Sequence, residues 1–391
     1  MTRLPRRKLG TTGYEISTVG LGTWALGGAG WSWSWGPQDD AQSVATIVAA
    51  VEAGINWLDT AAEYGLGHSE EVVGRALRAV PEADRPLVFT KCGLVWDPAA
   101  PMTPACQIAS PASIRRECED SLRRLGVEAI DLYQVHWPPA DGTPVDEYWA
   151  VMVELREAGK VRAVGLSNHG VAQLTAAEAI GHVDSLQPPL SAIGRDAAGD
   201  IIPWCAAHGT SVIVYSPMHS GLLSGSFDAA RLAPEDWRRR EPDWTEKLDA
   251  NLRVARALGD IAAVKGTTAG SVAVAWTLAW PGVTGAIVGA RSPRQISGWI
   301  DGAALRLTDA DLDSIAAAIR ASGAGTGPER PPVTGSAGDV AAVEVDDVAQ
   351  RVPGQPAVQV VGEDAHHVGL ESHVVTGHVR RDEDVGQSPE R

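Results

Sequence analysis

The chain repeats one structural unit between residues 15 and 320: an amphipathic helical stretch that ends at a glycine, followed by a short run of β-branched and apolar residues. In the first unit, Asp39 stands where an N-cap is expected, and Gly54 follows the helical residues, where it suits a left-handed C-terminal conformation. In the second, Ser110 and Pro111 mark a helix start. The pattern predicts that helix and strand alternate over about 300 residues.

This alternation predicts parallel strands covered by helices, because each helix must return the chain to the same end of the sheet. Eight such units fit a closed barrel better than an open sheet. We therefore expect an α/β fold, a (β/α)8 TIM barrel in a single domain. The predicted strands cover residues 19–22, 55–59, 87–91, 131–136, 161–166, 184–187, 211–215 and 285–289.

Composition separates this region from the last part of the chain. All 14 Trp residues precede residue 300, whereas residues 324–391 contain no aromatic residue and a single leucine, Leu370. The latter segment has too little bulky apolar surface to offset the entropy cost of folding. We expect a barrel domain over residues 1–322, and a disordered, low-complexity acidic tail rich in Val, Gly and Pro over 323–391.

The tail also contains four histidines, which are either solvated side chains in a loose segment or ligands of a metal ion. The first interpretation is favoured, and we predict no metal site. The four are His366, His367, His373 and His378.

Charge and cysteine usage exclude several other classes of function. A net charge of −16 argues against nucleic-acid binding, which requires clustered Lys and Arg. No apolar run approaches the ~20 residues that span a bilayer, and no secretory signal opens the chain. The four cysteines lie far apart without CxxC pairing, which argues against a zinc site or a disulfide framework. We expect a cytoplasmic protein without membrane or nucleic-acid partners.

Four ionisable residues stand at or just after predicted strand ends: Asp59, Tyr64, Lys91 and His136. Barrel active sites form where strands end and loops begin, so we expect these side chains to converge. Each alone has a structural explanation, since a strand-end Asp is commonly a cap and a lone Tyr commonly packs in a core. Their joint occurrence at the ends of three successive predicted strands favours a catalytic set.

The chemistry of this set points to a carbonyl substrate. A Lys that closes an apolar strand needs a partner, and Asp59 is the nearest plausible one. A cation near a phenol favours the phenolate, so we expect Lys91 to lower the pKa of Tyr64. Tyr64 would then give its proton to a carbonyl oxygen, and His136 would donate a hydrogen bond to the same oxygen.

The chain resembles the aldo-keto reductase superfamily over about residues 6–320. The motifs are GLGTW at 20–24, GINWLDTAAEYG at 54–65, HSEEVVG at 68–74, DLYQVH at 131–136, GLSN at 165–168, and YSP with GLLSG at 215–225. The resemblance implies a (β/α)8 barrel that reduces an aldehyde or ketone to an alcohol by hydride transfer from NADPH. It also implies a catalytic tetrad of Asp59, Tyr64, Lys91 and His136, with Tyr64 as general acid.

The last predicted strand ends in a candidate phosphate site. Ser292 and Pro293 mark a helix start, whose free N–H groups would face Gly289–Arg291. Arg291 would add a bidentate contact to a 2′-phosphate and favour NADP over NAD. A solvated Arg291 is the alternative.

The resemblance implies further cofactor contacts. Ser167, Asn168 and Gln187 would bind the carboxamide, Tyr215 would stack on the nicotinamide, and a loop from Ser216 would cover the pyrophosphate. The predicted cofactor-binding residues are Thr23, Trp24, Asp59, Ser167, Asn168, Gln187, Tyr215, Ser216, Pro217, Gly221, Gly289, Arg291 and Gln295.

Three positions depart from the family pattern. Gly298 and Trp299 replace a Glu-Asn pair that contacts adenine in many members, and His169 stands where an aromatic ring is common. NAD therefore stays the alternative cofactor. The run from Gly20 to Ala25 also fits a Rossmann fingerprint, but further glycines postpone the next helix to about Gln38, which argues against that fold.

Tryptophans cluster after the first, third and fourth predicted strands. Trp24, Trp31, Trp96 and Trp137 are predicted to line a substrate pocket for apolar or aromatic carbonyl compounds, although packing of loops against the barrel explains them as well. A dinucleotide-binding regulatory or sensor subunit with little turnover is the alternative function. The sequence leaves the physiological substrate, the reaction direction and the oligomeric state open.

Overall fold

The computed structural model describes residues 4–233 and 236–332, which lie in one compact unit. Most of the predicted tail, including its four histidines, lies outside the described residues. None of the described helices combines the length and the apolar content needed to cross a membrane.

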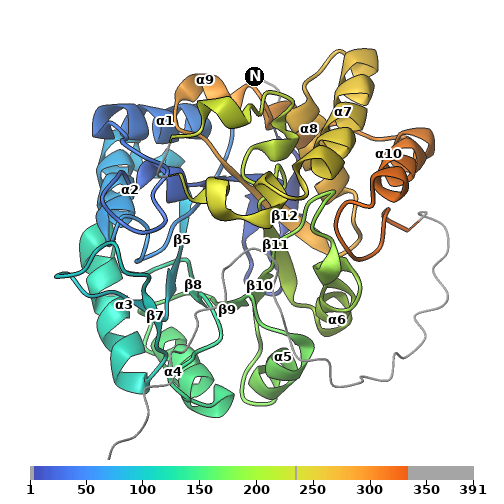
Figure 1. Ribbon diagram of the computed structural model, residues 1–391. Helices are drawn as coiled ribbons and strands as arrows, with labels where there is room; N and C mark the ends of the chain where they lie inside the picture. The colour runs from blue at the N-terminus through green and yellow to red at the C-terminus, as the bar shows by residue number, and fades with distance from the viewer. Residues whose placement is uncertain (1–3, 234–235, 333–391) are drawn as a thin grey trace, which may run out of the picture. The chain divides into compact units, whose positions relative to one another are not determined.

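Eight parallel strands form the closed barrel at the centre of the fold (Figure 1). The prediction of a (β/α)8 barrel is confirmed, and the Rossmann alternative is excluded by closure of the sheet. The strands succeed one another around the barrel in chain order. They are β3 (Val19–Gly22), β4 (Trp57–Asp59), β5 (Leu87–Cys92), β8 (Leu132–Val135), β9 (Val164–Ser167), β10 (Ser185–Gln187), β11 (Ser211–Tyr215) and β12 (Val283–Gly289).

Helices surround the barrel, as the ribbon view shows for α1 to α6 (Figure 1). They are α1 (Asp40–Glu52), α2 (His68–Ala79), α3 (Pro111–Leu125), α4 (Val145–Glu157), α5 (Val171–Glu178), α6 (Ile201–His208), α7 (Leu248–Lys265), α8 (Ala269–Leu278), α9 (Pro293–Ile296) and α10 (Asp309–Ser322).

Most of the helix caps expected from the sequence are present in the structure. The Asp39 side chain accepts a hydrogen bond from the Gln42 N–H at 2.8 Å and caps α1. Gly126 and Gly209 follow α3 and α6 in the left-handed conformation. Ser110 stands before α3, but its side chain makes no capping hydrogen bond.

Two short hairpins were not predicted. Near the N-terminus, β1 (Arg6–Lys8) pairs antiparallel with β2 (Glu15–Ser17), and β6 (Leu94–Val95) pairs with β7 (Cys106–Gln107) in the segment after β5. Strands of two or three residues give too short an alternating pattern to recognise in a sequence.

An apolar layer fills the inside of the barrel. Trp57, Phe89 and Leu132 meet there and cluster with Leu9 and Ile16 of the N-terminal hairpin segment, and all five are fully buried. The layer also explains Gly20, because a Cβ atom there would lie 2.3 Å from the Trp57 ring. The GLG motif of β3 therefore leaves space for a tryptophan inside the barrel.

Contacts with the barrel continue beyond residue 322. The buried Arg195 side chain donates to the carbonyl of Ala324 at 3.1 Å and to that of Gly327 at 3.4 Å. Gly325 lies so close to the Ile193 carbonyl that a Cβ atom would approach it to 2.3 Å. The functional boundary of the domain stays a prediction, and these contacts define where to test it.

Candidate active site

The alternation of side chains along the strands brings the predicted catalytic residues together. Residues two apart on a strand share a face, so the residue two positions after each member of the apolar layer also points into the barrel. Asp59 follows Trp57 in this way, and Lys91 follows Phe89. A polar layer therefore lies one step above the apolar one, at the carboxyl end of the strands.

Lys91 is the centre of the polar layer. Its Nζ atom lies 2.6 Å from Asp59 Oδ1, 2.8 Å from the Thr60 carbonyl and 3.5 Å from the Tyr64 hydroxyl. The predicted pairing of Lys91 with Asp59 agrees with these distances. Gln187 also donates to Asp59 Oδ2 at 2.8 Å, so both carboxylate oxygens are engaged.

Tyr64 and His136 face one another above Lys91. Their ring centroids are 5.7 Å apart in an edge-to-face arrangement, and Lys91 Nζ lies 5.1 Å from the centre of the Tyr64 ring. The structure thus brings all four residues of the predicted tetrad to one place at the barrel mouth.

The expectation that Lys91 lowers the pKa of Tyr64 is wrong for this structure. Burial raises the pKa of Tyr64 well above its ordinary value of 10.0, and the nearby carboxyl groups of Asp59 and Glu63 add to the effect. Asp59 pairs closely with Lys91 and offsets its charge. Tyr64 is therefore a phenol at neutral pH, which is the protonation state that a general acid needs.

Burial also sets the charge of His136. It lowers the pKa of His136 well below 6.5, and the positive charge of Lys91 acts in the same direction. The imidazole is therefore neutral at physiological pH. It can donate one hydrogen bond without carrying a competing charge.

The predicted carboxamide ligands form a network around the end of β9. Asn168 accepts a hydrogen bond from the Tyr215 hydroxyl at 2.9 Å and donates to the His136 carbonyl at 3.0 Å. Ser167 donates to the Gln187 carbonyl at 2.9 Å. Behind them, the buried His169 lies 2.7 Å from the Ser167 carbonyl and 3.0 Å from the Tyr148 hydroxyl, and burial lowers its pKa to about 4. His169 thus packs behind the network and links the Ser167 carbonyl to Tyr148.

Backbone strain is confined to the same end of the barrel. Among the described residues, five that are not glycine have a positive φ angle, and all five follow β4, β9 or β11. Such conformations are costly, and they persist where the surrounding structure holds a site in shape. They are Leu66, Asn168, Ser216, His219 and Ser220.

Four of the predicted cofactor residues, Thr23, Pro217, Gly221 and Gly289, lie at or after the ends of β3, β11 and β12. Gly289 is exposed, and a Cβ atom added to it would meet a single atom within 4 Å, the Gly22 carbonyl oxygen at 3.9 Å. Gly221 (φ +94°) opens the turn Leu222–Ser224, whereas Pro217 is buried in the same loop. Thr23 is also buried, and it holds the Asp59 carbonyl through its hydroxyl at 3.1 Å. These residues fit the cofactor expected from the sequence.

Arg291 is engaged by the protein itself. Its Nε atom donates to Gln38 Oε1 at 3.0 Å and its Nη2 atom donates to the Pro37 carbonyl. Gln295 Oε1 accepts from the Arg291 backbone N–H at 2.7 Å. The side-chain contacts use two of the five N–H donors of the guanidinium group, so Arg291 is partly committed to the protein itself.

The four predicted pocket tryptophans do not behave alike. Trp24 packs nearly parallel to Tyr64, with centroids 6.2 Å apart. Trp31 is 2% exposed and donates to the Gly28 carbonyl, so it packs its own loop. Trp96 and Trp137 are half-buried in the segments after β6 and β8.

Sequence reasoning missed an aromatic cap over the mouth. Trp237, in the long loop after β11, stacks on Trp24 at 5.7 Å and contacts Trp35 and Trp244 edge-on. The neighbouring Arg238 lies over the Trp35 ring at 4.6 Å. The sequence does carry a signal for it: Trp237 and Trp244 stand in a connection between β11 and α7 that is much longer than a simple loop.

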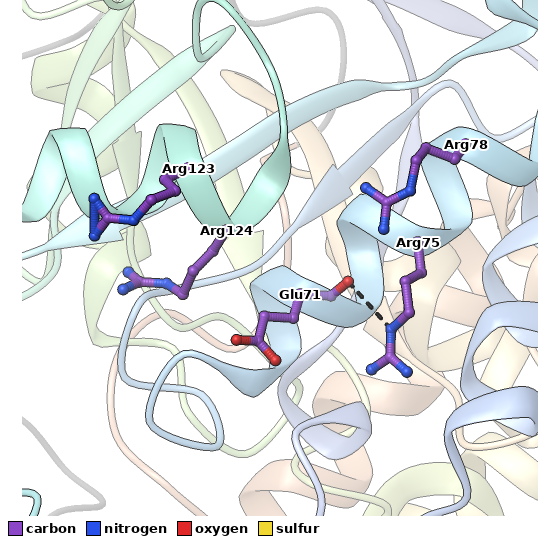
Figure 2. Close-up of a pocket in the computed structure, with 5 residues that line it drawn as sticks. All are labelled: Glu71, Arg75, Arg78, Arg123 and Arg124. Atoms are coloured by element: carbon purple, nitrogen blue, oxygen red, sulfur yellow. Dashed lines mark hydrogen bonds between the residues drawn. The ribbon is translucent and has the colours of Figure 1, made fainter.

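One surface hollow lies away from this site. It has a volume of about 440 Å³ between α2 and α3, and Figure 2 shows Glu71 there beside four arginines. Arg75 pairs with Asp40, Arg123 with Asp120, and Arg124 with Glu70. Arg78, Arg123 and Arg124 stand in the last turns of their helices, where positive charge offsets the helix dipole. Ion pairs thus account for three of the four arginines, and the helix dipole accounts for the position of Arg78.

The chain belongs to the aldo/keto reductase family, whose family model matches residues 18–320. It is 36% identical over 301 residues to the aldo-keto reductase YhdN of Bacillus subtilis (strain 168), covering 74% of this chain and 87% of that protein. It is 34% identical over 322 residues to the NADH-specific methylglyoxal reductase of Escherichia coli (strain K12), covering 80% and 96%.

A solved relative has the same fold. The glycerol dehydrogenase AKR11B4 from Gluconobacter oxydans superposes with a TM-score of 0.74 at 36% identity, covering 84% of this chain and 98% of that one. The protein is thus an aldo-keto reductase barrel, an oxidoreductase that uses a nicotinamide cofactor and acts on small carbonyl compounds.

Proposed function

We propose that the protein reduces an aldehyde or ketone to an alcohol with NADPH, and that Tyr64 is the proton donor. The observation that carries the proposal is the convergence of Lys91, Asp59, Tyr64 and His136 within hydrogen-bond or ring contact at the barrel mouth. When bound, the nicotinamide supplies the hydride. Tyr64 gives its hydroxyl proton to the carbonyl oxygen, and the neutral His136 orients that oxygen by a hydrogen bond.

Lys91 and Asp59 act through Tyr64. The phenolate left after proton transfer lies 3.5 Å from Lys91 Nζ, so the ammonium group stabilises the negative charge as it forms. Asp59 holds Lys91 in place at 2.6 Å and opposes the lowering of the Lys91 pKa that burial causes. Gln187, Ser167, Asn168 and Tyr215 would hold the nicotinamide end of the cofactor.

The cofactor preference is a separate part of the proposal. Arg291 supports NADPH, because a guanidinium binds a 2′-phosphate well. Its contacts with Gln38 and Pro37, and the relative named as NADH-specific, keep NADH as the alternative. We further propose a cytoplasmic location and no nucleic-acid partner. A regulatory subunit without turnover is not favoured, because two of the similar proteins are named as a reductase and a dehydrogenase.

The test is steady-state oxidation of NADPH and of NADH with a panel of small aldehydes and ketones, together with a binding titration of both cofactors. We expect turnover with carbonyl compounds and tighter binding of NADPH. Binding of a cofactor without turnover of any carbonyl compound would instead support a sensor role.

A further inference from the structure

Glu63, the residue before Tyr64, is a buried acid to which no role has been assigned so far. It is 8% exposed, in the loop between β4 and α2. In the part of the chain that the structure describes, no hydrogen bond joins its carboxyl group to another residue. Its oxygens are not among the described side-chain atoms that are fully shielded from solvent without a hydrogen-bond partner, so they keep some access to solvent and can meet a group that arrives from outside.

Other buried carboxylates in the described residues contrast with Glu63. Asp59 binds Lys91 and Gln187, and Glu70 binds Thr90 and Arg124, each contact being 2.6–2.8 Å. Further cases are Glu117, held by the Gly93 N–H and Ser113, and Asp184, held by the Val164 N–H and Arg156.

The electrostatic surroundings of Glu63 belong to the active site. The positive charge of Lys91 acts to lower the pKa of the Glu63 carboxyl group, and Glu63 in turn raises the pKa of the adjacent Tyr64. Lys91 is already paired with Asp59 at 2.6 Å, so it does not neutralise a second carboxylate. Burial accordingly raises the pKa of Glu63 to about 7, with Lys91 opposing the shift.

We propose that Glu63 accepts a hydrogen bond from a hydroxyl group on the carbon next to the substrate carbonyl, so that the enzyme prefers α-hydroxy aldehydes and ketones. The inference rests on the proposed function, because Tyr64 must hold the carbonyl oxygen while its neighbour in the chain holds the hydroxyl group. A neutral hydroxyl suits the site in both protonation states of Glu63, since a protonated carboxyl group still accepts a hydrogen bond through its carbonyl oxygen.

The ionisation of Glu63 gives this preference a pH dependence. The titratable groups around it at this end of the barrel are Lys91 on β5, Asp59 on β4, Tyr64 beside it and His136 after β8. Tyr64 is protonated and His136 is neutral at pH 7. Burial raises the pKa of Asp59 and lowers that of Lys91, and their ion pair at 2.6 Å opposes both shifts. Glu63 is a carboxyl group whose pKa lies near neutrality, at about 7. Its carboxylate form accepts a hydroxyl proton more strongly than its acid form.

The experiment compares hydroxyacetone with acetone, measured as the ratio of their kcat/KM values from pH 5.5 to 8.5. Both ketones use the same proton donor and hydride source, so the ratio cancels the pH dependence of the shared chemistry. In the wild-type enzyme we expect the ratio to rise roughly tenfold through a transition near pH 7. In Glu63→Gln and Glu63→Met the ratio should be flat and lower by about the same factor at pH 8.

Glu241→Gln is the matched control. Glu241 is also 8% exposed and acidic, burial likewise raises its pKa, and it lies in the loop after β11. This variant should keep the wild-type ratio and its transition. A ratio that is unchanged in both Glu63 variants would overturn the inference while leaving the proposed function intact. If the wild-type enzyme reduced neither ketone nor any aldehyde with either cofactor, the proposed function would fall, and this inference with it.

Discussion

The barrel interior has two layers that differ by only two residues along each strand. The lower layer contains Trp57, Phe89 and Leu132 and closes the barrel with apolar surface. The upper layer contains Asp59, Lys91 and Gln134, two positions later on the same strands. Both layers are buried, yet one is held by packing and the other by ion pairs and hydrogen bonds.

The comparison indicates that the lower layer stabilises the fold, whereas the upper layer contains groups that destabilise it. The lower layer has close contacts and a glycine that makes room for them. The upper layer has acids and bases with displaced pKa values, buried donors such as Gln134 Nε2 without an acceptor, and left-handed residues in the loops above it. Substitutions in the lower layer should therefore change folding, and those in the upper layer should change catalysis more than folding.

The largest effect is expected from Tyr64→Phe. Removing the proton donor should lower kcat/KM for carbonyl reduction by about 10²–10⁴-fold, which is the usual contribution of general acid catalysis. The melting temperature and the affinity for the cofactor should change little, because the ring and its packing against Trp24 are kept. Wild-type turnover in this variant, measured by cofactor oxidation, would end the assignment of Tyr64.

Lys91→Met tests whether the upper layer depends on its ion pair. The variant leaves Asp59 buried with Gln187 as its remaining side-chain partner, and we expect a loss of about 3–5 kcal/mol in the free energy of unfolding. Urea denaturation measures this loss. The double variant Asp59→Asn/Lys91→Met should recover most of the stability and none of the activity. Lys160→Met, which removes an exposed ion pair with Glu119, should leave stability unchanged.

Glu63→Gln should stabilise the protein in a pH-dependent way. The pKa of Glu63 lies at about 7 in the folded chain against an ordinary value of 4.5, so the folded state holds the proton longer than the unfolded state. The wild-type protein therefore loses stability as the pH rises from about 4.5 to 7, by roughly 3 kcal/mol. The variant should be more stable above pH 7, and the difference should vanish below about pH 4. Equal melting curves at pH 8 would contradict this prediction.

Gly20→Ala perturbs the lower layer alone. A Cβ atom at residue 20 would lie 2.3 Å from the Trp57 ring, and both groups are enclosed by the barrel. We expect a loss of about 1–3 kcal/mol from overpacking, with kcat reduced less than fivefold when the enzyme is assayed well below its melting temperature. A fully stable variant would indicate that Trp57 moves without cost.

The smallest effects concern the end of the barrel domain. Truncation after residue 332 should leave the melting temperature and turnover unchanged. Truncation after Ser322 removes the Ala324 and Gly327 carbonyl acceptors of the buried Arg195, which keeps the Ala192 carbonyl, and should cost about 1–3 kcal/mol. Loss of fold in the longer of these two truncated chains would show that the tail belongs to the domain.

The fold and much of the site could be predicted from local patterns. Helical periodicity, Asp39 as a cap and glycines at helix ends are properties of short segments, so they are legible without coordinates. The sequence also predicted the convergence of Asp59, Lys91 and His136. Each stands at a predicted strand end, and a barrel brings its strand ends to one mouth. The direction in which the Tyr64 pKa shifts could not be predicted from the sequence, because it depends on burial of the phenol and on the nearby Glu63 and Asp59.

The sequence by itself determined the order of helices and strands and which residues stand at strand ends, because these follow from periodicity and backbone preferences over a few residues. Only the tertiary structure decided that Trp237 packs on Trp24, that Arg291 is held by Gln38, and that Glu63 is buried without a partner. The first two are contacts between loops far apart in the chain. All three depend on burial and on distances that no local pattern encodes.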